Sequence, residues 1–175
     1  AEGSGEQTLT LTSTTGIRIV EITGSEICIL KVCWKCKAEE KPTPTSTPTP
    51  TFYPDPEGCV EAGDYYTTET SGLTSAVLGP IEIFAPSNAN GAPIGVNITD
   101  CSGDGALDIS IPWSESSAAK PASIVFSTSL CEGKAPRMAE VVLKHGYQCK
   151  LSAYDDAGNL VDSQEAMEES GEQTL

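Results

Sequence analysis

Apolar and polar residues alternate along most of this chain, which is the pattern of half-buried β-strands. The alternation is clearest near the start, where β-branched residues are separated by Thr-Gly and Thr-Gly-Ser turns. Helical periodicity is nearly absent. The predicted strands are 8–12, 17–22, 26–34, 75–84, 94–99, 106–111, 123–127, 139–143, 148–154 and 160–163.

About ten short strands with frequent turn residues predict an all-β protein, a β-sandwich of the jelly-roll or immunoglobulin-like type. We expect the first three strands to form a meander. The segment 155–159 reads Asp-Asp-Ala-Gly-Asn, which predicts a hairpin turn between the last two strands. The loops 86–93 and 112–121 are rich in Pro and Ser and are expected to project from one end of a sheet.

Residues 41–51 interrupt the strands with alternating Pro and Thr or Ser. Such a run buries nothing, lacks amide donors at its prolines and favours an extended linker. Dense hydroxyls beside proline are also typical of O-glycosylated stalks, and a bare semi-rigid spacer is the alternative. The candidate O-glycosylation sites are Thr43, Thr45, Ser46, Thr47, Thr49 and Thr51.

The two ends of the chain repeat each other. The letters Ser-Gly-Glu-Gln-Thr-Leu at 4–9 recur at 170–175, an offset of 170 − 4 = 166 residues. A duplicated tag is one interpretation, but the first copy runs directly into an alternating strand. The repeat therefore favours a tandem array, or a homopolymer whose identical tails dock into neighbouring copies.

These features predict four segments. Residues 1–37 are strands that complete a sandwich, their own or a neighbour's; 38–57 are a stalk; 58–166 are the main sandwich; and 167–175 are a connector that repeats residues 1–9. In an array, the folding unit is circularly permuted in this numbering. Strand exchange with a neighbouring copy, at an open sheet edge, would build a fibre.

Charge excludes several partners. Charged residues are 20% of the chain, and 25 acids against 10 bases give a net charge of −15. Nucleic acid and anionic membranes need basic surfaces and are poor partners. Neither a membrane-spanning run nor the pattern of a signal peptide is found, so the sequence is either mature or part of something larger.

Seven cysteines in 175 residues indicate disulfides and an oxidising, extracellular or cell-surface location. Cys28 and Cys33 lie an odd number of positions apart on one strand, so their side chains face opposite ways and each needs another partner. An odd total leaves at least one thiol free or paired between subunits. The pair Cys33 and Cys36 has the spacing of a redox or zinc motif, but a strand end before a proline run suits neither. The predicted disulfide residues are Cys28, Cys33, Cys36, Cys59, Cys101, Cys131 and Cys149.

Two further motifs concern modification and metal binding. Asn97 begins an Asn-Ile-Thr triplet and is a candidate N-glycosylation site. The segment 100–108 imitates the first half of a calcium loop, but Ile111 stands where the closing Glu belongs. An acidic hairpin loop is the better interpretation, and we assign no metal and no cofactor.

No catalytic constellation emerges from the sequence. His145 has no obvious nucleophile, and its place beside a glycine suggests a surface residue. The acid pairs at 155–156 and 168–169 fit a turn and a solvated connector. We therefore expect the chain not to be an enzyme.

The run 16–34, followed by the Thr-Pro segment, resembles the closing strands of jelly-roll modules in large bacterial or archaeal surface, adhesin-like and filament proteins. Residues 151–163 resemble an immunoglobulin-like hairpin. The resemblance implies a repeat unit of an extracellular surface or filament protein. Such modules often carry an acidic pair where this chain has Leu30 and Lys31, so no calcium or sugar site is transferred.

Three functions follow, in order of preference. The first is a structural subunit of a glycosylated extracellular filament or surface layer, whose partners are other copies of itself and covalent glycans. The second is a carbohydrate-binding or adhesive module, in which Trp113, Tyr65, Tyr66 or Trp34 stacks on sugars. The third is an accessory domain of a secreted enzyme.

Overall fold

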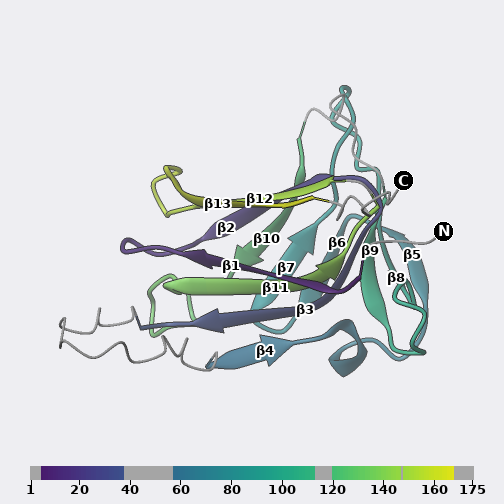
Figure 1. The fold of residues 1–175 in the computed structure, drawn as a ribbon, viewed down its shortest axis with the longest axis horizontal. Coiled ribbons are helices and arrows are strands. Elements are labelled where there is room, and N and C mark those ends of the chain that lie inside the picture. Colours follow the sequence, from purple (N-terminus) through teal and green to yellow (C-terminus); the bar gives the residue numbers. More distant parts are fainter. Residues whose placement is uncertain (1–4, 38–56, 113–119, 147, 168–175) are drawn as a thin grey trace, which may run out of the picture.

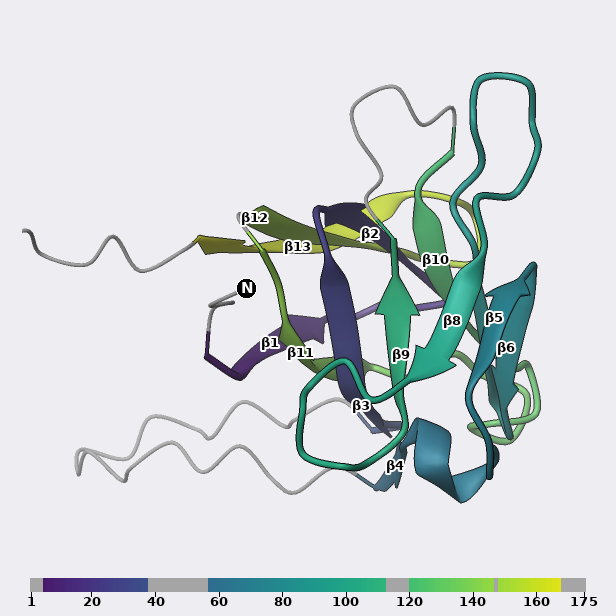
Figure 2. The same cartoon turned by 90° about the vertical axis from the view of Figure 1, so that its right-hand side faces the viewer.

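Two antiparallel β-sheets, packed face to face, make up the part of the chain that the computed structural model describes, residues 5–37, 57–112, 120–146 and 148–167 (Figure 1, Figure 2). The predicted all-β sandwich is therefore confirmed. The first sheet runs in the order β1 (Gln7–Thr12), β11 (Met138–Lys144), β3 (Ile27–Lys35), β9 (Asp108–Ile111), β8 (Val96–Thr99) and β5 (Thr70–Leu73), and β4 (Gly58–Val60) also pairs with β3. The second sheet runs in the order β13 (Leu160–Met167), β12 (Gln148–Tyr154), β2 (Ile19–Gly24), β10 (Ala122–Phe126), β7 (Ile81–Phe84) and β6 (Ser75–Leu78).

The alternation in the sequence becomes the core between the sheets. In β2, Val20 and Ile22 are buried while Glu21 lies on the other face, and Ile124 of β10 packs at the same level as Val20. Burial of an aliphatic side chain of this size contributes about 1.5–3 kcal/mol. The core is mainly aliphatic, and its largest fully buried side chains are Phe126, Leu11, Ile17, Ile22, Ile27, Ile29, Leu78, Ile81, Ile83, Ile98, Ile109 and Ile111.

The expected meander of the first three strands is wrong. β1 and β3 lie in the first sheet with β11 between them, whereas β2 lies in the second sheet. Both connections turn at glycines with positive φ, Gly16 at +108° and Gly24 at +152°. At Gly16 a Cβ would lie 2.8 Å from the Cβ of Ala135, so only glycine lets the backbone pass this closely. The Thr-Gly turns therefore carry the chain across the sandwich.

Several short elements were not predicted. The segment 75–84 is a hairpin, β6 and β7, which turns at Gly79 with φ +60°. The strands β4 and β5 and the 3₁₀ turn η1 (Ala62–Asp64) lack an alternating apolar pattern. Pairing with β3 and with β8 forms β4 and β5, and this information is not local in the sequence.

The hairpin β12–β13 forms as expected. Asp155 Oδ1 accepts hydrogen bonds from the backbone N–H groups of Ala157 at 3.0 Å and Asn159 at 2.9 Å, which closes the turn. Beyond the predicted end at Ser163, β13 continues to Met167. Its outer edge lies beside β1 of the other sheet, where the Thr12 N–H donates to Asp162 Oδ2 at 2.8 Å.

Residues 5–37 complete the sandwich of their own chain, because β11 is paired on one side with β1 and on the other with β3. No helix in the described ranges is long and apolar enough to span a membrane.

Candidate functional site

The first copy of the terminal repeat forms the start of an edge strand. In β1, Gln7, Thr8 and Leu9 pair antiparallel with Leu143, Val142 and Val141 of β11. Leu9 packs against the core, and the amide oxygen of Gln7 lies 3.3 Å from Nε2 of His145. On its other side β1 pairs with no second strand of its own sheet among the described residues, but β13 of the second sheet lies beside it there.

His145 is a buried residue and not the surface residue that the sequence suggested. Its exposed fraction is 2%. The chain passes from the first sheet to the second between Lys144 and Gln148, and this corner folds inward beneath the first residue of β1. The sequence shows that a glycine follows His145, but it does not show that the chain folds inward at this corner.

The same corner is where β13 ends. Gln148, the first residue of β12, is opposite Met167, the last residue of β13, while Gln7 is opposite Leu143 near the end of β11. β1 therefore begins, and β13 ends, at one end of the sandwich, on the right of Figure 1. We call this end, built around residues 5–7, 24–26, 143–146, 148 and 167, the terminal corner.

The neighbouring turn supports the terminal corner. The backbone N–H of Gly146 donates to the Ser25 carbonyl at 3.0 Å, and the Ser25 N–H donates to the Gln148 carbonyl at 3.4 Å. The next residue, Glu26, has φ +52°, which is uncommon outside glycine. These contacts fix both sheets at the point where the repeat meets the fold.

The opposite edge of the second sheet is protected. The backbone N–H of Val77, in the edge strand β6, donates to the hydroxyl of Tyr66 at 3.1 Å. An edge amide that is already bonded is a poorer template for another strand. The edge strand β1 has a comparable bond, since the Thr12 N–H donates to Asp162 Oδ2, so this feature does not rank the two edges.

Three disulfides join six of the seven cysteines, and each connects β3, or the segment directly after it, with another part of the chain. They pair Cys28 with Cys101, Cys33 with Cys59, and Cys36 with Cys131, at Cα–Cα distances of 5.8, 4.0 and 5.4 Å. Cys28 and Cys33 have separate partners, as their spacing predicted. Cys33 and Cys36 are not paired with each other, which excludes a dithiol redox pair in this state. All three bridges start on β3 or directly after it.

Cys149, which the prediction included among the disulfide residues, is a free thiol, in keeping with the odd number of cysteines. Its exposed fraction is 1%, on the inner face of β12. Burial raises the pKa of this thiol to about 12, so it stays protonated and unreactive at neutral pH.

Asn97 lies on the outer face of β8, between the buried residues Val96 and Ile98. Its amide oxygen accepts the backbone N–H of Gly72 at 2.9 Å, where β5 loses its regular register. The amide nitrogen is the atom that would carry a glycan. N-glycosylation at Asn97 stays a prediction, and the candidate O-glycosylation sites between Thr43 and Thr51 lie outside the described residues.

The acidic loop between β8 and β9 uses its carboxylates on its own backbone. Asp100 accepts the N–H groups of Gly103 at 2.7 Å, Asp104 at 3.1 Å and Gly105 at 2.9 Å. The Ala106 N–H donates to Asp104 and is the main cause that lowers the pKa of this carboxyl, with Ser102 second. Carboxylate oxygens of Asp100, Asp104 and Asp108 lie within 4.8 Å of one another, but the hydrogen bonds make them part of a turn.

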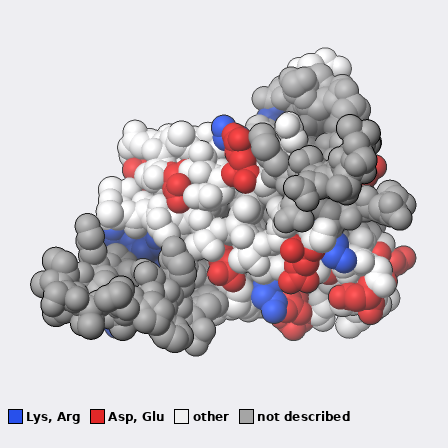
Figure 3. Space-filling view, in the orientation of Figure 1, with Lys and Arg blue, Asp and Glu red and all other residues white. Residues whose placement is uncertain are grey.

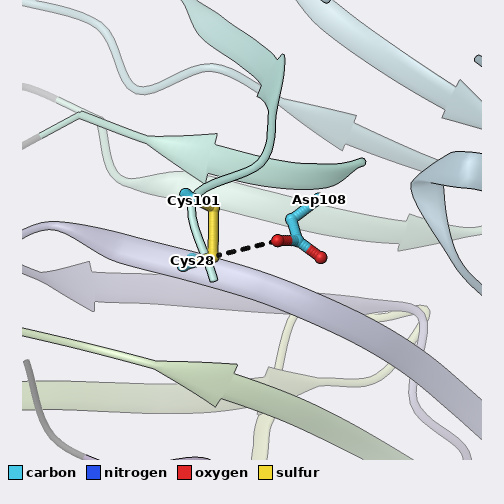
Figure 4. Close-up of side chains that lie close together, drawn as sticks. All are labelled: Cys28, Cys101 and Asp108. Carbon is cyan, nitrogen blue, oxygen red and sulfur yellow. Dashed lines mark hydrogen bonds between the residues drawn. A yellow bond between two sulfur atoms is a disulfide. The ribbon is translucent and has the colours of Figure 1, made fainter. Parts of the chain in front are cut away.

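Asp108 is the buried member of this group, with an exposed fraction of 3%. Its Oδ2 accepts the Ser102 N–H at 3.0 Å and lies 3.7 Å from the sulfur of Cys28, which is bonded to Cys101 (Figure 4). A disulfide sulfur carries no hydrogen, so this last contact is only a close approach. Asp108 therefore holds the loop against the disulfide.

A cleft of about 480 Å³ opens beside this disulfide, and Glu26, Lys144 and His145 are among its lining residues. The Lys144 ammonium donates to the Ser102 carbonyl at 3.0 Å, so the charged group that faces the loop is engaged. The cleft adjoins the terminal corner and combines charges of both signs. We see in it a junction of loops and no arrangement of nucleophile, base and orienting group.

Three of the four aromatic residues considered for sugar binding are described. The hydroxyl of Tyr66 is bonded to β6, and Trp34 packs against the core and closely over Gly58. Tyr65 is exposed by 47%. Trp113 lies outside the described residues. Of the three described rings, Tyr65 is the most exposed, and its hydroxyl end lies against Gly79.

Comparison with known proteins gives no relatives: no family model, no curated protein and no solved structure matches this chain.

Proposed function

We propose that the chain is a secreted structural subunit of a glycosylated extracellular filament or surface layer, built from jelly-roll or immunoglobulin-like modules. Its units join through strand addition or through tandem repetition. One observation carries the proposal: a sequence that forms the start of edge strand β1 is repeated letter for letter at 170–175, after β13 ends at the same corner. A repeated strand sequence gives a second copy the same fit to β11.

The covalent framework supports an extracellular setting. Three disulfides fit an oxidising compartment. Acidic side chains are spread over the face shown in Figure 3, in keeping with a net charge of −15. This charge favours solubility and keeps copies apart except where specific contacts join them.

We assign the chain no enzymatic role. In the described acidic loop the Asp100 carboxylate accepts backbone hydrogen bonds, and in the cleft beside it the Lys144 ammonium donates to the Ser102 carbonyl. The second candidate is a carbohydrate-binding module, favoured by the exposed ring of Tyr65.

Material from the native source tests the proposal by intact mass and denaturing gels, with and without reductant and chemical deglycosylation. We expect species larger than one chain, which lose mass on deglycosylation. A single unmodified band at 18.3 kDa, together with a monomer in light scattering and binding to a sugar array, would favour the module instead.

A further inference from the structure

We propose that residues 168–175 of one copy replace residues 2–9 on β11 of a second copy, and that the exchange is reciprocal and joins two copies as a two-fold pair. This inference rests on the proposed structural function and specifies the contact that joins its subunits. The partner is a second copy of this chain, and the site is the β1 position at the terminal corner.

The sequence identity extends beyond the six-letter repeat. With the same offset of 166, Glu168 matches Glu2, and only Glu169 differs from its counterpart, Gly3. Gln173, Thr174 and Leu175 therefore correspond to Gln7, Thr8 and Leu9, the residues that pair with β11. The incoming segment can make the same strand pairing and place a Gln beside His145.

The exchange leaves the core of the sandwich in place. Of the paired residues, Thr8 is exposed and Gln7 and Leu9 are only partly buried, whereas Leu11 is completely buried. Thr10, Leu11 and Thr12 can thus remain in place and anchor their own strand while a second copy supplies the residues before them. Because the exchanged side chains are identical, either segment pairs with β11 equally well. The protein concentration therefore determines the proportion of monomer and exchanged pair.

The terminal corner determines the geometry of the pair. Six residue steps separate Met167 from Gln173 and span at most about 20 Å. A donor must therefore bring the end of its β13 close to the corner of the acceptor. β1 begins at the same corner where β13 ends, so the donor's own β1 position then faces the acceptor. This arrangement favours insertion of the acceptor's residues 168–175 into the donor in turn. A filament or layer would grow from such pairs through other surfaces.

A cysteine pair can trap the exchange. Ser13 N–H bonds to the Arg137 carbonyl and Thr12 N–H points to Asp162, so odd-numbered residues of β1 bond to β11 and even-numbered residues do not. Thr8 and Val142 are directly opposed in such a non-hydrogen-bonded pair. The native bridge between Cys33 and Cys59 shows that directly opposed residues in this sheet accept a disulfide.

The experiment uses the full chain with Thr174→Cys and Val142→Cys, oxidised while folded and run on non-reducing gels across a range of concentrations. We expect a covalent dimer that reductant dissolves. Thr8→Cys with Val142→Cys is the positive control and should bridge within one chain. Thr174→Cys with Val77→Cys is the negative control, because Val77 lies on the protected β6 edge.

Two further variants test the exchange itself. Gln173→Pro removes an amide that should bond to β11 and should abolish the dimer, whereas Glu169→Pro, before the paired residues, should not. Deletion of residues 1–9 should lower the concentration for half-dimerisation by roughly tenfold or more, since the β1 position on β11 is then always free.

The outcomes separate the two proposals. A ladder of crosslinked oligomers larger than a dimer would overturn reciprocity. Large assemblies in native material, combined with no intermolecular crosslink in the Thr174→Cys, Val142→Cys variant, would overturn the exchange. Both outcomes would leave the structural function standing. A chain that stays monomeric in every variant and in native material would overturn both.

Discussion

Removal of individual disulfides should destabilise the fold in the order of the chain lengths that they close. The bridge between Cys36 and Cys131 spans 95 residues, whereas the one between Cys33 and Cys59 spans 26. In the chain-entropy description, a disulfide stabilises the fold because it restricts the unfolded chain, and more so for longer loops.

The magnitudes follow from these separations. For 95 residues the loop-closure entropy corresponds to about 4.7 kcal/mol, and for 26 residues to about 3.5 kcal/mol. The Cys36→Ala, Cys131→Ala double variant should therefore lose more unfolding free energy than the Cys33→Ala, Cys59→Ala variant, by at most about 1.2 kcal/mol, because the remaining Cys28–Cys101 bridge shortens the longer loop.

Urea unfolding at neutral pH, followed by tryptophan fluorescence without reductant, measures both losses. The two double variants form a matched pair, since each removes one bridge and leaves Cys149 as the free thiol. Equal losses, or a larger loss for the shorter loop, would refute the reasoning and show that native contacts around Cys33 and Cys59 outweigh chain entropy.

Three other predictions concern single residues. Gly24→Ala should cost at least about 2 kcal/mol, because φ is +152° and a Cβ would collide with the start of β12, whereas Gly63→Ala meets nothing and should be neutral in thermal melts. Burial raises the pKa of Cys149 from 9.0 to about 12, so the folded chain holds this proton more tightly than the unfolded chain does. The unfolding free energy should therefore fall as pH rises from about 9 to about 12. Cys149→Ala should flatten that decline in urea titrations, and an unchanged slope would contradict the prediction. Tyr66→Phe removes the hydroxyl that covers the β6 edge amide and should raise the aggregation rate in light scattering with little loss of stability, while Tyr65→Phe should behave as the parent does.

Strand positions were largely predictable because their cause is local. In β2 and β12, apolar residues at every second position bury one face, and the sequence shows that pattern directly. The parity of Cys28 and Cys33 likewise correctly separated their partners. These features depend on residues close together in the chain.

The assignment of strands to sheets was not predictable in the same way. A glycine such as Gly24 permits both a hairpin and a crossing between sheets, and the outcome depends on the close approach of β12, far away in sequence. His145 is buried for the same kind of reason, since Gln7 and the corner that covers it come from distant segments. The repeat at the two ends was visible in the sequence, but its common place at the terminal corner required the fold.

The most direct test of the central claim is the molar mass of the full chain and of a variant that lacks residues 168–175, measured by light scattering from about 10 μM to about 1 mM. The account predicts that the mass of the full chain rises with concentration above 18.3 kDa and that the deletion abolishes the rise. Equal masses for the two chains at every concentration would contradict assembly through the repeated segment.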